Sequence, residues 1–415
     1  MSKRIEPEIE TFARIRVVGV GGSGCNAVNH MINSKVRGVE FVAVNADAQD
    51  LHRSESRRKV HIGKNLTRGL GTGMNPELGK RAAEETRQQI QETLQGSDMV
   101  FITCGMGGGT GTGASAVIAK IAKEVGALVI AIVTKPFSFE GAQRKDIADR
   151  GLAELKKEVD AFIVIPNDKL LSAVEQTLSL KQAFALCDEV LREAVEGVSD
   201  IIRTPGDINT DFNDIKAVME GAGPTLMGIG ISEGDERAKE AAKRAVNSPL
   251  LDISISGAKG ILWVIAHSDD LGIMEVHEAS KIISESVDKN AKIIWGVMKD
   301  NKLKKGQLRI IVIATGFPES AAHVTHAGSE RSLFSLSAER REEERGRIYH
   351  EVLKREEKKE EGKEKKHEAA ESSIRVEKEE PIVTATPHKR EEVVSVPEDE
   401  EVWGAIPAFL RRHKK

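Results

Sequence analysis

Cysteine and aromatic residues are scarce in this sequence of 415 residues. Its three cysteines, Cys25, Cys104 and Cys187, are far apart in the chain, and aromatic residues make up only 4% of it. The lack of closely spaced cysteines excludes a disulfide-rich scaffold and favours a reducing, cytoplasmic location. With so few aromatic rings, the cores must be built from valine, isoleucine, leucine and alanine.

Long hydrophobic runs and a surplus of one charge are also missing. The run GILWVIA at 260–266 is far shorter than the roughly 20 apolar residues of a membrane-spanning helix, and the charged N-terminus lacks the apolar core of a secretion signal. The net charge is only −4, without the basic excess typical of nucleic-acid-binding proteins. We therefore expect neither direct insertion into a membrane nor a nucleic-acid partner.

The first half of the chain shows a regular alternation of strand-like and helix-like segments. Apolar runs rich in valine and isoleucine predict strands at 15–20, 39–47, 98–105, 127–135 and 161–168. Helical patterns are found at 25–34, 76–95, 114–125 and 170–203. Near-continuous apolar strands separated by helices are typical of a parallel sheet covered on both faces. The sequence therefore predicts an α/β fold with a Rossmann-like parallel sheet, followed by a long helix.

A second, smaller α/β unit is predicted after the long helix, ending near residue 318. Its predicted strands are 225–232, 260–267, 291–299 and 307–315, and its predicted helices are 235–246 and 273–288. Beyond it the chain becomes dense in glutamate and lysine, and it is too poor in apolar residues to fold alone. Apolar residues return in the last stretch, EDEEVWGAIPAFLRRHKK, which is typical of a peptide that folds on a partner.

A glycine-rich turn joins the first predicted strand to the first predicted helix. Gly19, Gly21 and Gly24 fit the pattern G-x-G-x-x-G, and Asp47 follows at the end of the next strand. Both features match a dinucleotide-binding unit, in which the acid contacts the ribose. These residues alone would support an NAD-dependent oxidoreductase.

A second and richer glycine loop, GGGTGTG at 107–113, lies between another predicted strand and helix. Glycines leave backbone N–H groups open, so that several can point at one phosphate, and the helix N-terminus adds about half a positive charge. Thr110 and Thr112 supply hydroxyl groups. Two such loops on one sheet predict a longer phosphate chain held from both sides. Because G-K-[ST] does not occur in the sequence, the loop is not a P-loop.

Eight segments of the sequence, in order, carry a resemblance to a known family. They are GVGGSGCNAVNHM, NADAQDL, RGLGTGMNPELG, CGMGGGTGTGAS, TKPFSFEG, IPNDKLL, FALCDEVL and NTDFNDIKAVM. They resemble FtsZ, the tubulin-like cell-division GTPase, over about residues 14–318, and the terminal IPAFLRR is similar as well. The resemblance implies a GTP-binding domain at 14–180, a central helix at 181–203 and a C-terminal activation domain at 204–318. We expect a flexible arm at 1–13, a disordered charged linker at 319–397 and a partner-binding peptide at 398–415.

The resemblance implies GTP, GDP and Mg²⁺ as ligands, with Mg²⁺ on the phosphates rather than on side chains of one subunit. The residues implied to bind the nucleotide are Gly21, Gly22, Ser23, Gly24, Asn26, Asn45, Asp47, Gly71, Thr72, Gly73, Gly107, Gly108, Gly109, Thr110, Gly111, Thr112, Gly113, Glu140, Arg144, Asn167, Phe184 and Asp188. Asn26 and Asp188 would read guanine, and Phe184 would stack on its face. One carboxylate can accept both N–H donors on an edge of guanine, a pair that adenine lacks.

The catalytic residues implied by the resemblance are Asn209, Asp211 and Asp214 in NTDFND. In FtsZ this loop enters the nucleotide site of the next subunit and positions the attacking water and Mg²⁺ near the γ-phosphate. We therefore expect the chain to polymerise head to tail into the ring at the cell-division site and to hydrolyse GTP on assembly. The spacing of Asp211 and Asp214 also suits helix capping. A structural tubulin relative that hydrolyses GTP poorly is the other alternative.

The terminal peptide is implied to bind membrane-attached adaptor proteins of the division machinery. Such binding would bring a cytoplasmic protein to the inner face of the membrane. The residues expected to contact the adaptor are Trp403, Ile406, Pro407, Phe409, Leu410 and Arg411.

The three cysteines adjoin the implied nucleotide residues. Cys25 follows the first glycine turn, Cys104 precedes the second, and Cys187 is next to Asp188. We expect all three to line or border the pocket as small buried residues. A three-cysteine metal site is the alternative, although the spacing resembles no zinc motif.

Overall fold

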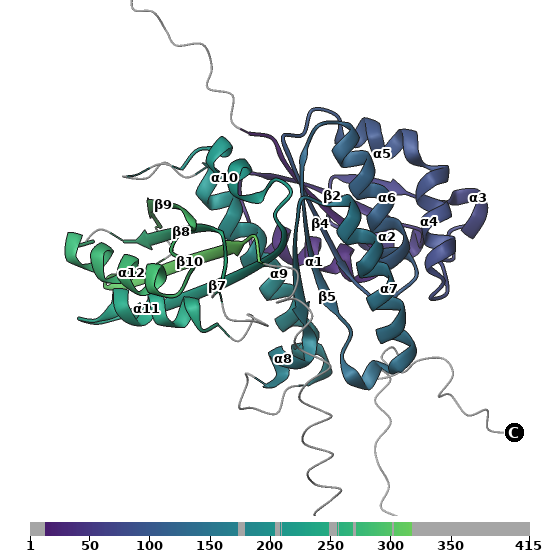
Figure 1. The fold of residues 1–415 in the computed structure, drawn as a ribbon. Helices are drawn as coiled ribbons and strands as arrows, with labels where there is room; N and C mark the ends of the chain where they lie inside the picture. Colours follow the sequence, from purple (N-terminus) through teal and green to yellow (C-terminus); the bar gives the residue numbers. More distant parts are fainter. Residues whose placement is uncertain are drawn as a thin grey trace, which may run out of the picture. The chain divides into compact units, whose positions relative to one another are not determined.

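The structure is a computed structural model, drawn as a ribbon in Figure 1. It describes residues 13–172, 179–203, 208, 210–248, 255, 257–268, 271–300 and 303–317. The predicted N-terminal arm up to residue 12, the charged linker and the terminal peptide with its six contact residues lie outside the described residues. So does Asn209.

Ten strands of the described residues form one sheet, in the order β3-β2-β1-β4-β5-β6-β7-β10-β8-β9. Their bounds are β1 Ile15–Val20, β2 Val39–Asn45, β3 Arg58–His61, β4 Met99–Gly105, β5 Leu128–Lys135, β6 Ala161–Pro166, β7 Gly223–Glu233, β8 Gly260–His267, β9 Lys292–Lys299 and β10 Gln307–Thr315. The first six strands in this order, β3-β2-β1-β4-β5-β6, are all parallel. This is the Rossmann order, which confirms the predicted fold class.

The C-terminal part of the sheet is mainly antiparallel. Strand β10 pairs antiparallel with both β7 and β8, and β9 runs parallel to β8. The two parts of the sheet are joined where Ala161 and Phe162 of β6 pair with Gly223 and Pro224 of β7. The predicted second unit is therefore continuous with the first at the level of backbone pairing.

Helices cover both faces of the parallel strands. Their bounds are α1 Gly21–Asn33, α2 Ala48–Arg53, α3 Lys64–Thr67, α4 Pro76–Glu85, α5 Arg87–Leu94, α6 Thr110–Glu124, η1 Ser138–Glu140, α7 Ala142–Glu158, α8 Asn167–Ser172, α9 Leu180–Arg203, α10 Phe212–Met219, α11 Arg237–Val246 and α12 Ile273–Glu285. Because successive strand residues point to opposite faces, Val17 joins a cluster with α1 and α9, whereas Val18 joins one with α4 to α7.

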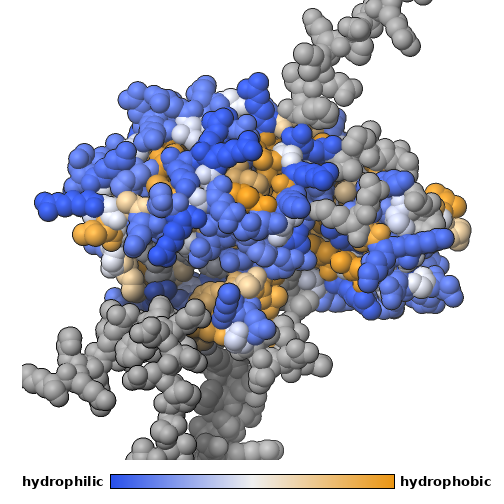
Figure 2. Space-filling model, turned by 180° about the vertical axis from the view of Figure 1, so that it is seen from behind, coloured by the Kyte–Doolittle hydropathy of each residue, from blue (hydrophilic) through white to orange (hydrophobic). Residues whose placement is uncertain are grey.

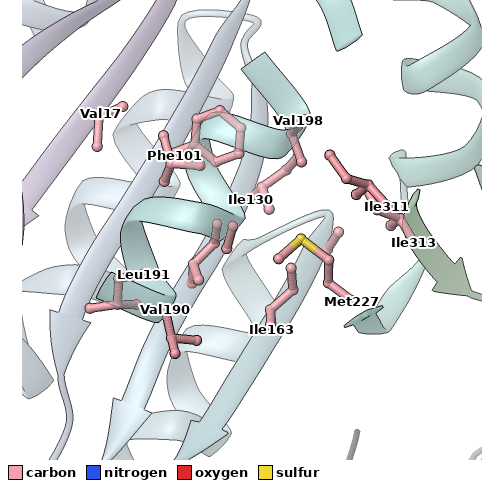
Figure 3. Close-up of a cluster of buried hydrophobic side chains, with 14 of the residues drawn as sticks. Val17, Phe101, Ile130, Ile163, Val190, Leu191, Val198, Met227, Ile311 and Ile313 are labelled. Atoms are coloured by element: carbon pink, nitrogen blue, oxygen red, sulfur yellow. The ribbon is translucent and has the colours of Figure 1, made fainter. Parts of the chain in front are cut away.

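The long helix α9 is buried between the parallel strands and the C-terminal strands (Figure 3). Its side chains Val190, Leu191 and Val198 belong to one buried cluster with residues of both parts, namely Phe101, Ile130, Ile163, Met227, Ile311 and Ile313. Each fully buried side chain of this kind contributes about 1.5–3 kcal/mol. The helix is therefore held along its length by both parts of the sheet.

The surface is mainly hydrophilic on the face shown in Figure 2, with apolar side chains in separate patches. Among the described residues, Leu70 and Ile273 are the most exposed large apolar side chains, at 84% and 80%. Within the described part of the chain, no helix combines the length and the hydrophobicity that crossing a bilayer requires.

The structure differs from the predicted elements at glycines and in short segments. Helices α1 and α6 begin at Gly21 and Thr110, four residues before the predicted starts at 25 and 114. Glycine has low helix propensity, so the sequence pattern did not predict helix at these residues. The N–H groups of the first turn have no helical acceptor, so tertiary packing decides where each helix begins. The predicted helix 76–95 is interrupted at Thr86, and the predicted strand at 161–168 ends at Pro166.

Six elements have no counterpart among the segments predicted with bounds, namely β3, α2, α3, η1, α7 and α10. The first four have six residues or fewer, too few for a hydrophobic period to become visible. The predicted helical stretch 170–203 corresponds to α8 and α9 in the described residues.

Replacing Phe101 with alanine should destabilise the fold strongly. The side chain is fully buried in the cluster around α9, and deletion of a buried phenylalanine costs about 3–5 kcal/mol. The urea midpoint of the nucleotide-free protein measures the change. Ile273→Ala, at an exposed position, is the control and should stay within about 0.5 kcal/mol of the wild type. Equal shifts for both variants would contradict the placement of Phe101.

Candidate functional site

A groove lies at the carboxyl edge of the parallel strands, where β1, β4, β5 and β6 lead into the next helices. It is made of a pocket of about 390 Å³ and a neighbouring pocket of about 540 Å³. Gly22, Thr72, Thr110 and Arg144 line both pockets. We call the pocket with Phe184 the aromatic end and the other the acidic end. Ligands of open α/β sheets bind at this edge.

The two predicted glycine loops touch each other in this groove. Gly21 has φ +72°, and a methyl group placed on it would lie 2.8 Å from the backbone nitrogen of Gly111. Gly107 has φ +99°, and its N–H donates to Thr112 Oγ1 at 2.9 Å. Both positions therefore need glycine, for conformation and for close approach. The loop residues that line the aromatic end are Gly22, Ser23, Gly108, Gly109, Thr110 and Gly111.

The helices α1 and α6 begin in these turns without a side-chain cap. Neither helix has an acidic residue in its first turn. The first four N–H groups of a helix have no helical acceptor, and its N-terminus carries about half a positive charge. Two uncapped N-termini at one groove suit a ligand with several phosphate groups.

The acidic end collects oxygen atoms. Asp47 caps α2, accepting hydrogen bonds from the N–H groups of Gln49 and Asp50 at 2.9 and 3.0 Å. The buried Asn45 donates through Nδ2 to Asp50 Oδ2 at 2.7 Å. Burial, and then the charge of Asp47, raises the pKa of Asp50. The predicted Gly71, Thr72 and Gly73 also line this end.

Asn167, Phe184 and Asp188 meet at the aromatic end. Asn167 is only 4% exposed, yet its Oδ1 has no hydrogen-bond partner among the described residues. Phe184 lies edge-on to Phe137, with ring centroids 5.4 Å apart, and remains 42% exposed. Burial raises the pKa of Asp188 to about 6, an effect that His30 partly offsets. A buried acceptor and a carboxyl group beside an exposed ring fit a flat ligand with N–H donors.

An ion pair joins the two ends of the groove. Arg144 Nη1 donates to Glu140 Oε2 at 2.7 Å, one helical turn apart, and Arg144 lines both pockets. Glu140 also accepts a hydrogen bond from the N–H of Phe137 at 2.9 Å. This second bond fixes the carboxylate, so the guanidinium is held over the middle of the groove.

Some predicted residues support the groove without lining it. Gly21, Gly24 and Gly107 are turn and packing positions, while Thr112 and Gly113 face a separate cavity of about 640 Å³ between α4, α6 and α7. The prediction missed Asp50, although the spacing D-x-x-D in NADAQD places it one helical turn from Asp47. It also missed Leu191, which lines the groove. Leu191 lies one helical turn after Cys187 on α9, so helical spacing from Cys187 could have indicated it.

Asp211 and Asp214 do not line the groove. They form a reciprocal cap at the start of α10. The N–H of Asp214 donates to Asp211 Oδ1 at 2.8 Å, and the N–H of Asp211 donates to Asp214 Oδ2 at 3.2 Å. The capping interpretation is therefore confirmed. The other oxygen of each carboxylate has no partner within the described residues, and so remains available to a ligand.

Helix α9 separates these acids from the groove. It rises by about 22 Å between Asp188 and Arg203. The acids follow beyond its C-terminal end, and α10 lies at the opposite end of α9 from α8 (Figure 1). Strand β7, directly after α10, pairs with the first residues of β6, at the amino edge of the parallel strands. The groove thus lies at the carboxyl ends of the parallel strands, and the two acids lie toward the opposite, amino ends. We call these the two opposite edges of the sheet.

Comparisons with known families identify the family of this chain. The model of the Tubulin/FtsZ family GTPase domain matches residues 14–175, and that of the FtsZ family C-terminal domain matches residues 223–318. The chain belongs to the tubulin/FtsZ family. It is therefore a GTPase that binds guanine nucleotide, and the NAD-dependent oxidoreductase hypothesis is wrong.

Solved structures of FtsZ are similar to this family member. An empty FtsZ dimer from M. jannaschii is 47% identical, with a TM-score of 0.70, and the match covers 74% of this chain and 89% of that one. A mutant FtsZ from M. jannaschii is 46% identical, with the same TM-score, over 74% and 92% of the two chains. CetZ2 from Haloferax volcanii, a GTPγS-bound protofilament, shares the fold at 22% identity and a TM-score of 0.64, over 80% and 99%.

The three cysteines are buried at separate places. Cys25 packs with Ala43 and Leu51, Cys104 Sγ lies 3.6 Å from Met106 Sδ, and Cys187 alone among them lines the groove. Across the described ranges, histidine, cysteine, aspartate and glutamate side chains do not gather in threes as a metal site, so the three-cysteine hypothesis is wrong.

Alkylation should be slow at all three thiols and sensitive to nucleotide at one. Burial raises the pKa of each thiol to about 12, so only about one in ten thousand is a reactive thiolate at pH 8. Adding GTP should slow iodoacetamide labelling of Cys187 further and leave Cys25 and Cys104 unchanged. Mass spectrometry of labelled peptides over time measures this. Protection of all three to the same degree would contradict the position of Cys187.

Proposed function

We propose that this GTPase assembles head to tail and hydrolyses GTP at the junction between two chains. The observation that carries the proposal is the separation described above. The groove lies at one edge of the sheet, and Asp211 and Asp214, with one free carboxylate oxygen each, lie toward the other. Stacking successive chains along the direction of α9 would bring the acids of one chain to the groove of the next.

The groove suggests how the nucleotide would lie. Guanine fits the aromatic end, against Phe184, with its N–H donors toward Asp188 and the orphaned Oδ1 of Asn167. Arg144 and the uncapped starts of α1 and α6 would hold the phosphates, and the terminal phosphate would reach the acidic end. Asn26 lines the aromatic end, as its predicted contact with guanine requires.

Oxygen donors at the acidic end suit Mg²⁺ bound to the phosphates. Asp47 and Asp50 offer carboxylates, and the hydroxyl groups of Thr72 and Thr110 lie 3.1 Å apart. Mg²⁺ would neutralise the charge that builds up on the phosphates during hydrolysis. Asp50 adds a carboxylate to those expected from the sequence.

The acids of the neighbouring chain would complete the chemistry. Their free carboxylate oxygens would orient a water for attack on the γ-phosphorus and accept its proton as the bond to the β-phosphate oxygen breaks. Asn209, whose position is not described, is proposed to assist. Phosphoryl transfer depends mainly on positioning and charge stabilisation, so a site shared by two chains is chemically sound.

Exposed apolar side chains around the groove support a covered surface there. Leu70 lines the acidic end and is 84% exposed, and Phe139 stacks on Phe137 with its ring 60% exposed. The FtsZ dimer and the CetZ2 protofilament show that similar proteins self-associate. We propose that the filaments form the division ring in the cytoplasm at the inner face of the membrane. Adaptors would bind residues 398–415, and the proposed domain bounds are those given above.

Removing either acid should abolish GTP turnover without weakening GTP binding. Asp211→Ala and Asp214→Ala leave the groove intact, so GTP affinity should equal that of the wild type, while turnover falls by about 100-fold or more. Mixing Asp211→Ala with an equal amount of Asp188→Asn, at a GTP concentration that saturates only the first variant, should restore turnover to about a quarter of the wild-type value per chain, because one junction in four then joins an intact groove to an intact pair of acids.

The same mixture distinguishes a shared site from a self-contained one. Turnover in the mixture no higher than that of the two variants measured alone would show that each chain hydrolyses its own GTP and would overturn the proposal. Sedimentation in parallel checks that both variants enter the filaments. Loss of GTP binding in Asp211→Ala would show that the acid belongs to the chain's own groove.

GTP affinity should fall as the pH drops through about 6. The pKa of Asp188 is about 6 without nucleotide, and its protonated form loses the acceptor that guanine needs. Affinity should be constant above pH 7 and weaken by up to about tenfold per pH unit below 6. Equilibrium dialysis measures it between pH 5 and 8. Asp188→Asn should bind more weakly and lose this dependence, and an unchanged pH profile in that variant would contradict the role of Asp188.

A further inference from the structure

The loop that carries Asp211 contacts β9 on the side that does not pair with β8. Strand β9 is the last strand in the sheet order and pairs with β8 on its other side. Ile208 forms an isolated antiparallel bridge with Val297 of β9. The N–H of Val297 donates to the carbonyl of Ile208 at 3.1 Å, and the N–H of Ile208 donates back at 3.5 Å. Among the described residues of the loop, this one backbone pair attaches it to the sheet, three positions before the first acid.

A close contact beside this bridge depends on a glycine. A methyl group placed on Gly296 would lie 2.6 Å from Thr210 Oγ1 and 3.2 Å from the carbonyl oxygen of Ile208. The first distance is too short for any side chain, so Thr210 Oγ1 would have to move. Because the second contact is with the backbone, turning the Thr210 side chain does not relieve both contacts, and the backbone of the loop must also shift. Because Thr210 immediately precedes Asp211, a shift of this backbone would pass directly to the acid.

The side chain of Thr210 packs against β9 through van der Waals contact and makes no hydrogen bond to a described residue. It is 7% exposed, and its Oγ1 has no hydrogen-bond partner among the described residues. A buried hydroxyl without a partner is unfavourable, because it has lost its hydrogen bonds to water. Removal of this hydroxyl therefore breaks no hydrogen bond of the described structure, and it makes room for a side chain at 296.

The other side of the acid pair is held by α10. Ile215 and Met219 of this helix are fully buried in the cluster around α9. The reciprocal cap ties Asp211 and Asp214 to its first turn. The two acids thus sit between a buried helix on one side and the contact with β9 on the other.

We propose that Gly296 is a positioning residue for GTP hydrolysis: by letting Thr210 lie against β9, it sets where Asp211 and Asp214 enter the neighbouring chain's groove. This inference rests on the proposed function. A misplacement of about 1 Å at a catalytic group can cost about 100-fold in rate. GTP binding does not depend on this contact, because the groove lies at the opposite edge of the sheet.

The test is a double-mutant cycle on Gly296→Ala and Thr210→Ala. Gly296→Ala should lower kcat per assembled chain by about tenfold or more, with unchanged GTP affinity and unchanged sedimentable polymer. Thr210→Ala should lower kcat by less than Gly296→Ala does. The double variant should recover most of the kcat of Thr210→Ala alone, because the oxygen at the shorter distance from the new methyl group is gone. Ile293→Ala, at an exposed position of the same strand, is the control for a change in β9 that leaves the loop contact intact.

The outcomes separate this inference from the proposed function. Wild-type kcat in Gly296→Ala, or a double variant as slow as Gly296→Ala, would overturn the positioning role. Full turnover in Asp211→Ala would instead overturn the shared site itself. If thermal unfolding shows that Gly296→Ala does not fold, Thr210→Ile enlarges the same contact from the loop. The same loss of kcat at unchanged GTP affinity is then expected, and wild-type kcat in Thr210→Ile would overturn the inference.

Discussion

The burial of α9 between the two parts of the sheet is the constraint on which the rest of the structure depends. One end of this helix brings Phe184 and Asp188 to the groove, and the other end leads to Asp211. Because apolar side chains from both parts of the sheet pack on it, the helix cannot tilt or slide without opening the core (Figure 3). The two halves of the proposed catalytic site are therefore kept apart within one chain, and a second chain is the natural means of joining them.

The groove is built to hold an anion with backbone groups rather than with many basic side chains. Two uncapped helix starts and the guanidinium groups of Arg53 and Arg144 are its positive elements, and Glu140 already pairs with Arg144. Carboxyl groups lie instead at the two extremities, Asp188 at one and Asp47 and Asp50 at the other. Burial makes ionisation of Asp188 and Asp50 costly, a cost that N–H donors of a base or a bound cation can offset.

Much of this arrangement could be predicted from the sequence. Period and composition indicated the parallel strands, the long helix and the second unit, and the two glycine loops indicated phosphate binding before any family was considered. The pattern could not indicate the short elements β3, α2 and α3, nor that the glycine loops continue as helix. It also could not distinguish Gly108, which lines the groove, from Gly113, which packs on α4. Both glycines stand in the same short motif, GGGTGTG, and the motif does not show which of them faces the ligand.

The sequence by itself determined the elements, their order and the residue types able to bind a nucleotide, since hydrophobic period, turn residues and loop composition are local properties of the chain. Only the tertiary structure decided which residues meet. It placed Asp50 beside Asn45, left Asn167 Oδ1 without a partner, set the groove and Asp211 at opposite edges, and brought Gly296 against Thr210. The contact between Thr210 and Gly296 joins residues 86 positions apart, and such relations depend on how buried surfaces pack, which no local pattern specifies.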